Sequence, residues 1–143
     1  MLRRWLGSIS SLAMVIGCAA CLEQPTDLKP SVELFLTTQG EVQEQALRTL
    51  VASGRAALPP LEAALHRTEP KERRAALLAL RRLGLHEAVP LLGHVAQFDA
   101  DASIRADARA VLERWAAEKS PRGEAAQRAL FAAAAGETGD SLR

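Results

Sequence analysis

One segment of the chain occurs twice, thirty residues apart, and this repetition limits most strongly the folds that the chain can adopt. The stretch 42–50 aligns with the stretch 72–80, and the alignment continues to place Gly54 on Gly84. A third, partial copy occupies residues 104–112, where the interval has grown to thirty-two residues. A near-constant period of this length is typical of stacked helical repeats, in which each unit buries its apolar face against its neighbours.

The apolar spacing within each copy predicts two helices joined by a turn. The expected helices are, in pairs, about 42–53 and 59–68, 71–83 and 87–97, and 102–119 and 123–135. A shorter helix after Pro30, with Ser31 as its N-cap, is expected to cover the first repeat. Its expected apolar face comprises Val32, Leu34, Phe35 and Leu36.

Stacked repeats should share one continuous core, because a single helix pair cannot cover its own apolar face. The expected core residues are Ala46, Leu47, Leu50, Leu61, Leu65, Ala76, Leu77, Leu80, Leu91 and Val95. Ala76 and Ala108 are expected at close helix crossings, where a larger side chain would not fit.

The second copy shows how the repeat is built. Glu72-Arg73 is followed by Ala76 and Leu80, by a turn at Gly84, and by the segment 89–92, which reads Val-Pro-Leu-Leu. This order resembles HEAT-type repeats, in the short variety first recognised in phycobilin lyases, over roughly residues 41–118. The resemblance implies an all-α fold, a short α-solenoid of HEAT-like helix pairs. It also implies that the repeat position shared by Arg73 and Arg105 forms a structural ladder between repeats. Because the family contains lyases, glycosylases and scaffolds, it implies architecture rather than activity, and no residue here matches a lyase role.

The N-terminal segment predicts export. Two arginines at 3 and 4 precede an apolar stretch from Trp5 to Ile16, which is too short to span a bilayer. The stretch ends in Val15-Ile16-Gly17-Cys18, which resembles the bacterial lipobox. That resemblance implies cleavage before Cys18, attachment of lipid (including palmitate) to this cysteine, and a lipid-anchored protein. The alanine at 19, directly after this cysteine, resembles the residue found there in lipoproteins sent to the outer membrane, which implies a protein that faces the periplasm.

The chain is therefore expected to divide into four parts: a signal peptide at 1–17, a lipidated cysteine and flexible tether at 18–30, a repeat domain at 31–135 and a frayed tail at 136–143. Cleavage after Ala20 instead would release a soluble secreted protein. Cleavage before Cys21 would place Cys18 at the position that prefers an aliphatic residue. The arginine pair leaves export by the twin-arginine route open beside the general route, and the role of Cys21 stays open.

Composition excludes several function classes. The 18 basic and 17 acidic residues are nearly balanced, and loss of Arg3 and Arg4 with the signal leaves no basic excess for nucleic-acid binding. The chain has no Tyr, three Phe and two Trp, too few for base-stacking surfaces or sugar-binding clefts.

The sequence contains no pattern that indicates a reaction centre. His66, His86 and His94 do not have the spacing of a metal-binding helix face. No catalytic residue, metal site, cofactor or small-molecule substrate is predicted, and the chain is not expected to be an enzyme.

One local charge excess lies between residues 67 and 82. It is either a solvated helix face or a contact for an anionic partner such as a lipid headgroup, lipopolysaccharide or an acidic protein. Its candidate contact residues are Arg67, Lys71, Arg74, Arg81 and Arg82.

These features predict an exported, membrane-anchored lipoprotein whose solenoid is a protein-interaction or scaffold module in the cell envelope. One alternative is a small enzyme or ligand-binding protein that uses the solenoid groove, and in that case His86, His94 and nearby acids should converge on a cleft. Another alternative is an accessory piece of a larger envelope assembly.

Overall fold

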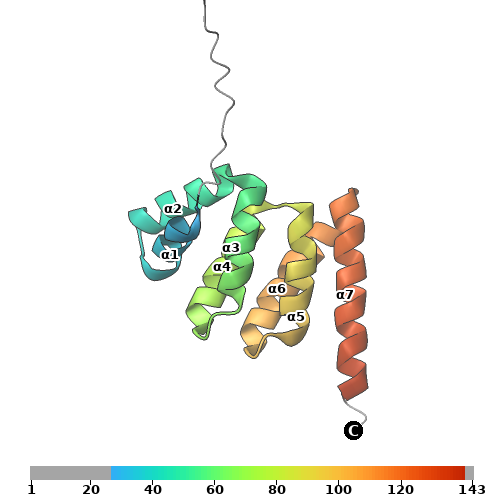
Figure 1. Ribbon diagram of the computed structural model, residues 1–143. Helices are drawn as coiled ribbons and strands as arrows, with labels where there is room; N and C mark the ends of the chain where they lie inside the picture. The colour runs from blue at the N-terminus through green and yellow to red at the C-terminus, as the bar shows by residue number, and fades with distance from the viewer. Residues whose placement is uncertain (1–26, 141–143) are drawn as a thin grey trace, which may run out of the picture.

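The computed structural model describes residues 27–140, and within this range the regular structure is entirely helical, with no strand. The helices are α1 (Lys29–Thr37), α2 (Glu41–Ala52), α3 (Leu58–Leu65), α4 (Pro70–Leu83), α5 (Val89–Phe98), α6 (Ala102–Ala116) and α7 (Pro121–Asp140), with two short 3-10 helices, η1 (Gly54–Ala57) and η2 (His86–Ala88). The helices stack side by side from α1 at one end to α7 at the other (Figure 1). The predicted all-α solenoid is confirmed.

The helices pack as three pairs followed by a single helix. Helix α1 packs against α2, α3 against α4 and α5 against α6, and α7 covers both α5 and α6 at the end of the stack. In Figure 1, α3 and α5 lie in front of α4 and α6, so the pairs form two layers. Helix α1 is therefore the first member of a pair rather than a separate cap. A repeat period does not specify where the unit begins, and only packing against α2 shows it.

The turn between successive pairs changes length along the stack. Gly54 and Gly84 both have positive φ values, 55° and 62°, which explains glycine at this repeat position. The buried alanine before the next helix follows three residues after Gly54, at Ala57, but four residues after Gly84, at Ala88. The repeat interval is therefore thirty residues up to the glycine and thirty-one after it.

That extra residue corrects one core prediction. Leu61 is fully buried, but its partner in the next pair is Leu92, also fully buried, whereas Leu91 is only partly buried against the core. The remaining expected core residues are buried, and Ala76 and Ala108 have no exposed surface. The core runs without interruption from α1 to α7.

The first helix begins earlier than predicted. Leu28 occupies the N-cap position of α1 and is itself buried, so Ser31 is not the N-cap. Pro30 lies in the first turn of α1, where its missing N–H has no helical partner to lose. Val32 and Phe35 face the core, but Leu34 is 48% exposed, contrary to the predicted face.

The last helix also differs from its predicted bounds. Helix α7 starts at Pro121 and its backbone remains helical to Asp140, five residues beyond the expected end at Ala135.

Candidate functional site

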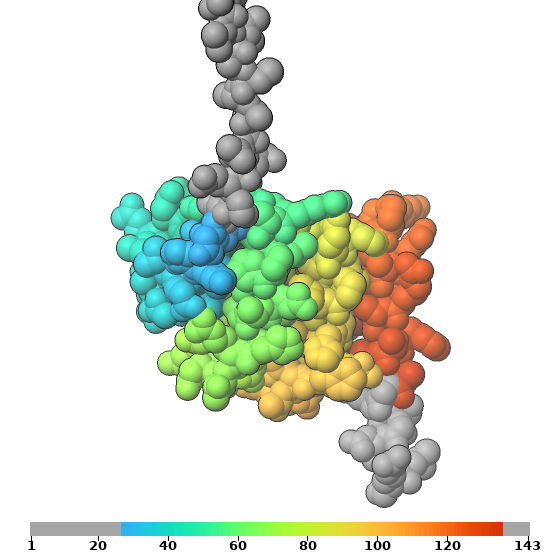
Figure 2. All heavy atoms as spheres, in the orientation of Figure 1, coloured from blue at the N-terminus to red at the C-terminus, as the bar shows by residue number. Residues whose placement is uncertain are grey.

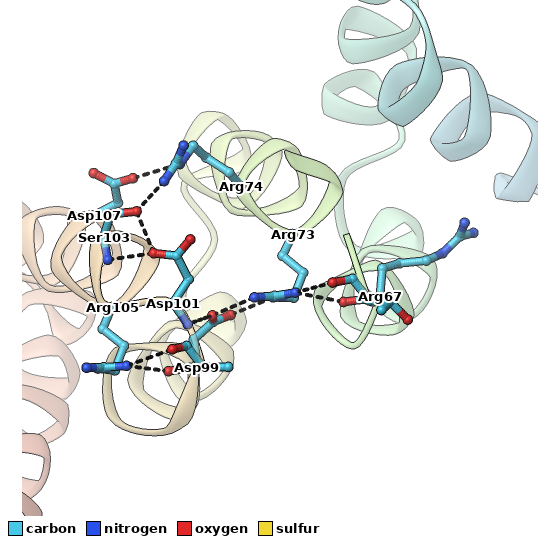
Figure 3. Close-up of polar contacts among 10 residues, drawn as sticks. Arg67, Arg73, Arg74, Asp99, Asp101, Ser103, Arg105 and Asp107 are labelled. Atoms are coloured by element: carbon cyan, nitrogen blue, oxygen red, sulfur yellow. Dashed lines mark hydrogen bonds and ion pairs between the residues drawn. The ribbon is translucent and has the colours of Figure 1, made fainter. Parts of the chain in front are cut away.

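Arg73 is buried although it is charged, and it joins two successive helix pairs. Its Nε and Nη2 atoms donate to the two carboxylate oxygens of Asp99, both at 2.9 Å, in the turn between α5 and α6. Its Nη1 atom donates to the carbonyl oxygens of Arg67 and Thr68, at 3.0 and 2.8 Å, in the turn between α3 and α4. Figure 3 shows the guanidinium between these two turns. A single side chain therefore ties the turn of its own pair to the turn of the next.

Burial and hydrogen bonding act in opposite directions on Asp99. Burial alone raises the pKa of its carboxyl group, but the hydrogen bonds from Arg73 and from the backbone N–H of Asp101 outweigh it, so the pKa is lowered. The hydrogen bond to Asp99 raises the pKa of Arg73 above its usual value. Both groups are therefore charged at neutral pH.

The same repeat position is used in each pair. Arg105 donates to the carbonyl oxygen of Asp99 at 2.7 Å, as Arg73 donates to that of Arg67. In the first pair, Gln43 takes this position and donates to the carbonyl oxygen of Phe35 at 3.1 Å. The ladder between repeats that the HEAT resemblance implies is present only in part: Arg73 links two pairs, whereas Arg105 and Gln43 donate to carbonyl oxygens of their own pairs.

A groove lies between α4 and α6, in the rear layer of Figure 1, with a volume of about 340 Å³. We call it the α4–α6 groove, and its lining residues are Arg74, Ala75, Leu77, Leu78, Arg81, Asp107, Ala110, Val111 and Arg114. At one end, Arg74 pairs with Asp107 across the groove, with Nε and Oδ2 3.3 Å apart, and also contacts Ser103 (Figure 3). Asp101, the N-cap of α6, bonds to Ser103, and this lowers the pKa of Asp101.

The other end of the α4–α6 groove is different. Arg81 and Arg114 line it, one from each helix, and neither has a hydrogen bond or ion pair with any residue that the structure describes. Both side chains are exposed. This end therefore presents two unneutralised guanidinium groups beside an apolar floor.

A second groove, of about 530 Å³, lies between α3 and α5, on the face toward the viewer in Figure 2. Its lining includes Glu62, His66 and His94, with the exposed Phe98 at its edge. The His94 ring lies 4.9 Å from the Phe98 ring and 6.3 Å from the His66 ring, measured between centroids. We call this the α3–α5 groove.

The histidines are thus grouped differently from the expected arrangement. His86 lines a separate hollow between α5 and α7, so it does not meet His94, whereas His66 does. No three His, Cys, Asp or Glu residues within 27–140 are placed to share a metal ion.

The five candidate anion contacts do not form one surface. Arg74 and Arg81 line the α4–α6 groove, whereas Arg67 pairs with Glu33 of α1 and lines both the α3–α5 groove and a further groove, of about 590 Å³, between α1 and α3. The Glu33 hydrogen bond raises the pKa of Arg67. Lys71 and Arg82 are exposed and line none of these grooves.

Arg114 is not among the predicted anion contacts, because those residues all come from one continuous stretch of the sequence, 67–82. A signal existed, since Arg114 follows Asp107 by seven residues, as Arg81 follows Arg74. Two such steps on neighbouring helices bring Arg81 and Arg114 to the same groove.

Cys18, the predicted lipidation site, lies outside the described residues. Between residues 27 and 140, no helix combines the length and the apolar character that crossing a bilayer requires.

Comparison with known proteins agrees with this geometry. Neither the curated proteins nor the solved structures contain a match to the chain. The family profile described as HEAT repeats matches residues 32–113, from within α1 to within α6. The matched range spans the three helix pairs and leaves out α7. The chain therefore belongs to the HEAT-repeat family.

Proposed function

We propose that the chain is an exported lipoprotein, anchored through Cys18 at a membrane of the cell envelope, whose helical stack binds a partner protein. The observation that carries the binding part is that both layers of a HEAT-repeat stack present open grooves. Stacks of this kind present extended surfaces to other proteins, and HEAT repeats commonly serve as interaction scaffolds.

The anchoring part rests on the segment 15–18 and its resemblance to the lipobox. Two or more acyl chains bind a membrane stably, because each buried methylene contributes about 0.8 kcal/mol. The expected location is the outer membrane, with the helical stack facing the periplasm.

Palmitate labelling in a bacterial host tests the anchor. The parent chain should incorporate label and sediment with membranes, and Cys18→Ala should do neither, whereas Cys21→Ala should behave as the parent does. An unlabelled parent chain, or a Cys18→Ala chain that stays fully in the membrane fraction, contradicts the lipoprotein proposal.

Pull-down from solubilised membranes tests the binding module. The lipidated chain should retain one envelope protein in reproducible amounts. Repeated recovery of no protein contradicts a protein-binding role.

One observation favours a second candidate, a small-ligand or enzymatic site. His66 and His94 share the α3–α5 groove with Glu62, which supplies convergent polar groups beside an apolar wall. A ligand in this groove should change the NMR signals of both imidazoles. Unchanged signals across a metabolite panel, together with recovery of a protein partner, favour the binding module.

A further inference from the structure

Among the residues that line the α4–α6 groove, three from each helix face one another in pairs, and we call each facing pair of residues a level. On α4, Arg74, Leu78 and Arg81 follow at helical spacing, and on α6 Asp107, Ala110 and Arg114 do the same. The Arg74–Asp107 pair closes the first level. Leu78 and Ala110 form an apolar second level, and the third level contains only Arg81 and Arg114.

Charge is balanced at the first level and unbalanced at the third. Within the described residues, no carboxylate accepts from Arg81 or Arg114, although each guanidinium carries five N–H donors in a planar fork. Two cations facing one groove repel each other, and an anion between them removes that repulsion. A carboxylate suits this place because a guanidinium can bind it through two parallel hydrogen bonds.

The apolar level decides what carries the carboxylate. Leu78 is half-buried and Ala110 exposed, so an apolar group of a ligand can pack there, about one helical turn from the arginines. A segment with an acidic residue one turn from an apolar residue satisfies both levels. An anionic bilayer surface fits less well, because its headgroups would also lie over the exposed carboxylate of Glu113 next to Arg114, whereas a protein segment can place a single carboxylate between the two arginines.

We propose that the α4–α6 groove binds an acidic amphipathic segment of a partner protein, with its carboxylate between Arg81 and Arg114 and its apolar side chain against Leu78 and Ala110. This proposal rests on the proposed function insofar as the chain is a protein-binding module, and it names the chemistry of the partner.

The test measures fluorescence anisotropy of a synthetic labelled peptide, in which leucine and glutamate recur at helical spacing, with the full lipidated chain in a zwitterionic detergent. We expect Arg81→Glu with Arg114→Glu to weaken binding by about tenfold or more. Arg82→Glu, which reverses a single charge outside the groove, should alter the Kd by less than about twofold. A peptide with lysine in place of glutamate should prefer the Arg81→Glu, Arg114→Glu chain to the parent.

A second variant tests the apolar level while keeping the positive charge. Ala110→Arg fills the floor, so it should weaken binding of the glutamate peptide although it adds a cation. All these positions are exposed, so circular dichroism and the unfolding temperature should match the parent.

Three outcomes overturn the proposal: equal peptide binding by the parent and by the Arg81→Glu, Arg114→Glu chain, an Arg82→Glu effect as large as theirs, or tighter binding by Ala110→Arg. A fourth is flotation of the Cys18→Ala chain with phosphatidylglycerol vesicles through Arg81 and Arg114 without peptide binding, which assigns the groove to a lipid surface. The anchor is judged separately, because peptide binding by the Cys18→Ala chain does not depend on lipid. If the Arg81→Glu, Arg114→Glu chain still retains the partner recovered by pull-down, the protein-binding role is supported and the assignment of that partner to the α4–α6 groove is wrong.

Discussion

The packing of α7 against the rest of the stack depends on a single residue, Gly123. A Cβ atom there would lie 2.0 Å from the carbonyl oxygen of Glu118 and 3.0 Å from that of Trp115. Both atoms belong to the backbone, one in the turn between α6 and α7 and the other in the last turn of α6, so neither can rotate away as a side chain can. Glycine is therefore required here by space, although its φ is ordinary.

We expect Gly123→Ala to lower the free energy of unfolding by about 1–3 kcal/mol through overpacking. The sign is informative, because alanine in a helix interior normally stabilises by about 1 kcal/mol relative to glycine. Thermal unfolding measures the effect, with the exposed Arg128→Ala on the same helix as a control. A higher unfolding temperature for Gly123→Ala would show that α7 is not seated as described.

The Asp99 carboxylate makes the free energy of unfolding depend on pH. Its pKa is lower in the folded chain than in the unfolded one, so its contribution is present above the unfolded value of about 3.9 and is lost as pH falls through the folded value. Asp99→Asn should cost about 1–3 kcal/mol at pH 7, because the buried Arg73 loses a charged acceptor. Urea unfolding should show this difference shrinking below about pH 4. A constant difference down to about pH 2 would contradict it, and Asp107→Asn, at an exposed pair, should show little pH dependence.

At the scale of elements, the sequence predicted which segments are helical and largely which residues face the core. It did not predict how the helices pair. The repeated pattern runs through α2 and α3 as readily as through α1 and α2, and the pairing depends on contacts that no period encodes. The additional residue after Gly84 was hidden for a related reason, since proline–leucine pairs at 60–61 and 90–91 align without a gap.

The candidate site was less predictable than the helices. Arg74 and Arg81 were identified because they stand close together in sequence, but their third partner, Arg114, comes from α6 and joins them only through packing. In the same way, His66 and His94 lie twenty-eight residues apart and meet because α3 and α5 are neighbours in one layer.

Helix α4 is the central element of the stack, so a cavity in its buried face should be costly. Leu80 is fully buried there, and Leu80→Ala should lower the free energy of unfolding by about 2–5 kcal/mol. Leu34→Ala, on the exposed side of α1, should cost much less. Thermal unfolding compares the two. Equal unfolding temperatures for Leu80→Ala and the parent would show that the repeat register is wrong.

At the scale of the whole molecule, buried polar side chains do not link the three pairs equally. Arg73 links the second pair to the third through the buried bond to Asp99. Its counterpart in the first pair, Gln43, donates only to Phe35 of its own pair. The side-chain links from the first pair to the second include the exposed contact of Glu33 with Arg67, and exposed ion pairs contribute about 0–1 kcal/mol.

Because the first pair lies at the end of the stack that no other described helix covers, and Gln43 supplies no buried ion pair to its neighbour, the stack should open from its first pair. Amide hydrogens of α2 should exchange with solvent through a local opening of low free energy, whereas those of α4 and α6 should share one higher value set by global unfolding. Native-state hydrogen exchange monitored by NMR measures these values. In Arg73→Gln the shared value should split, and α6 should begin to exchange independently of α4. The residue at the repeat position of Gln43, Arg73 and Arg105 thus determines whether the helix pairs open one at a time or unfold as a single cooperative unit.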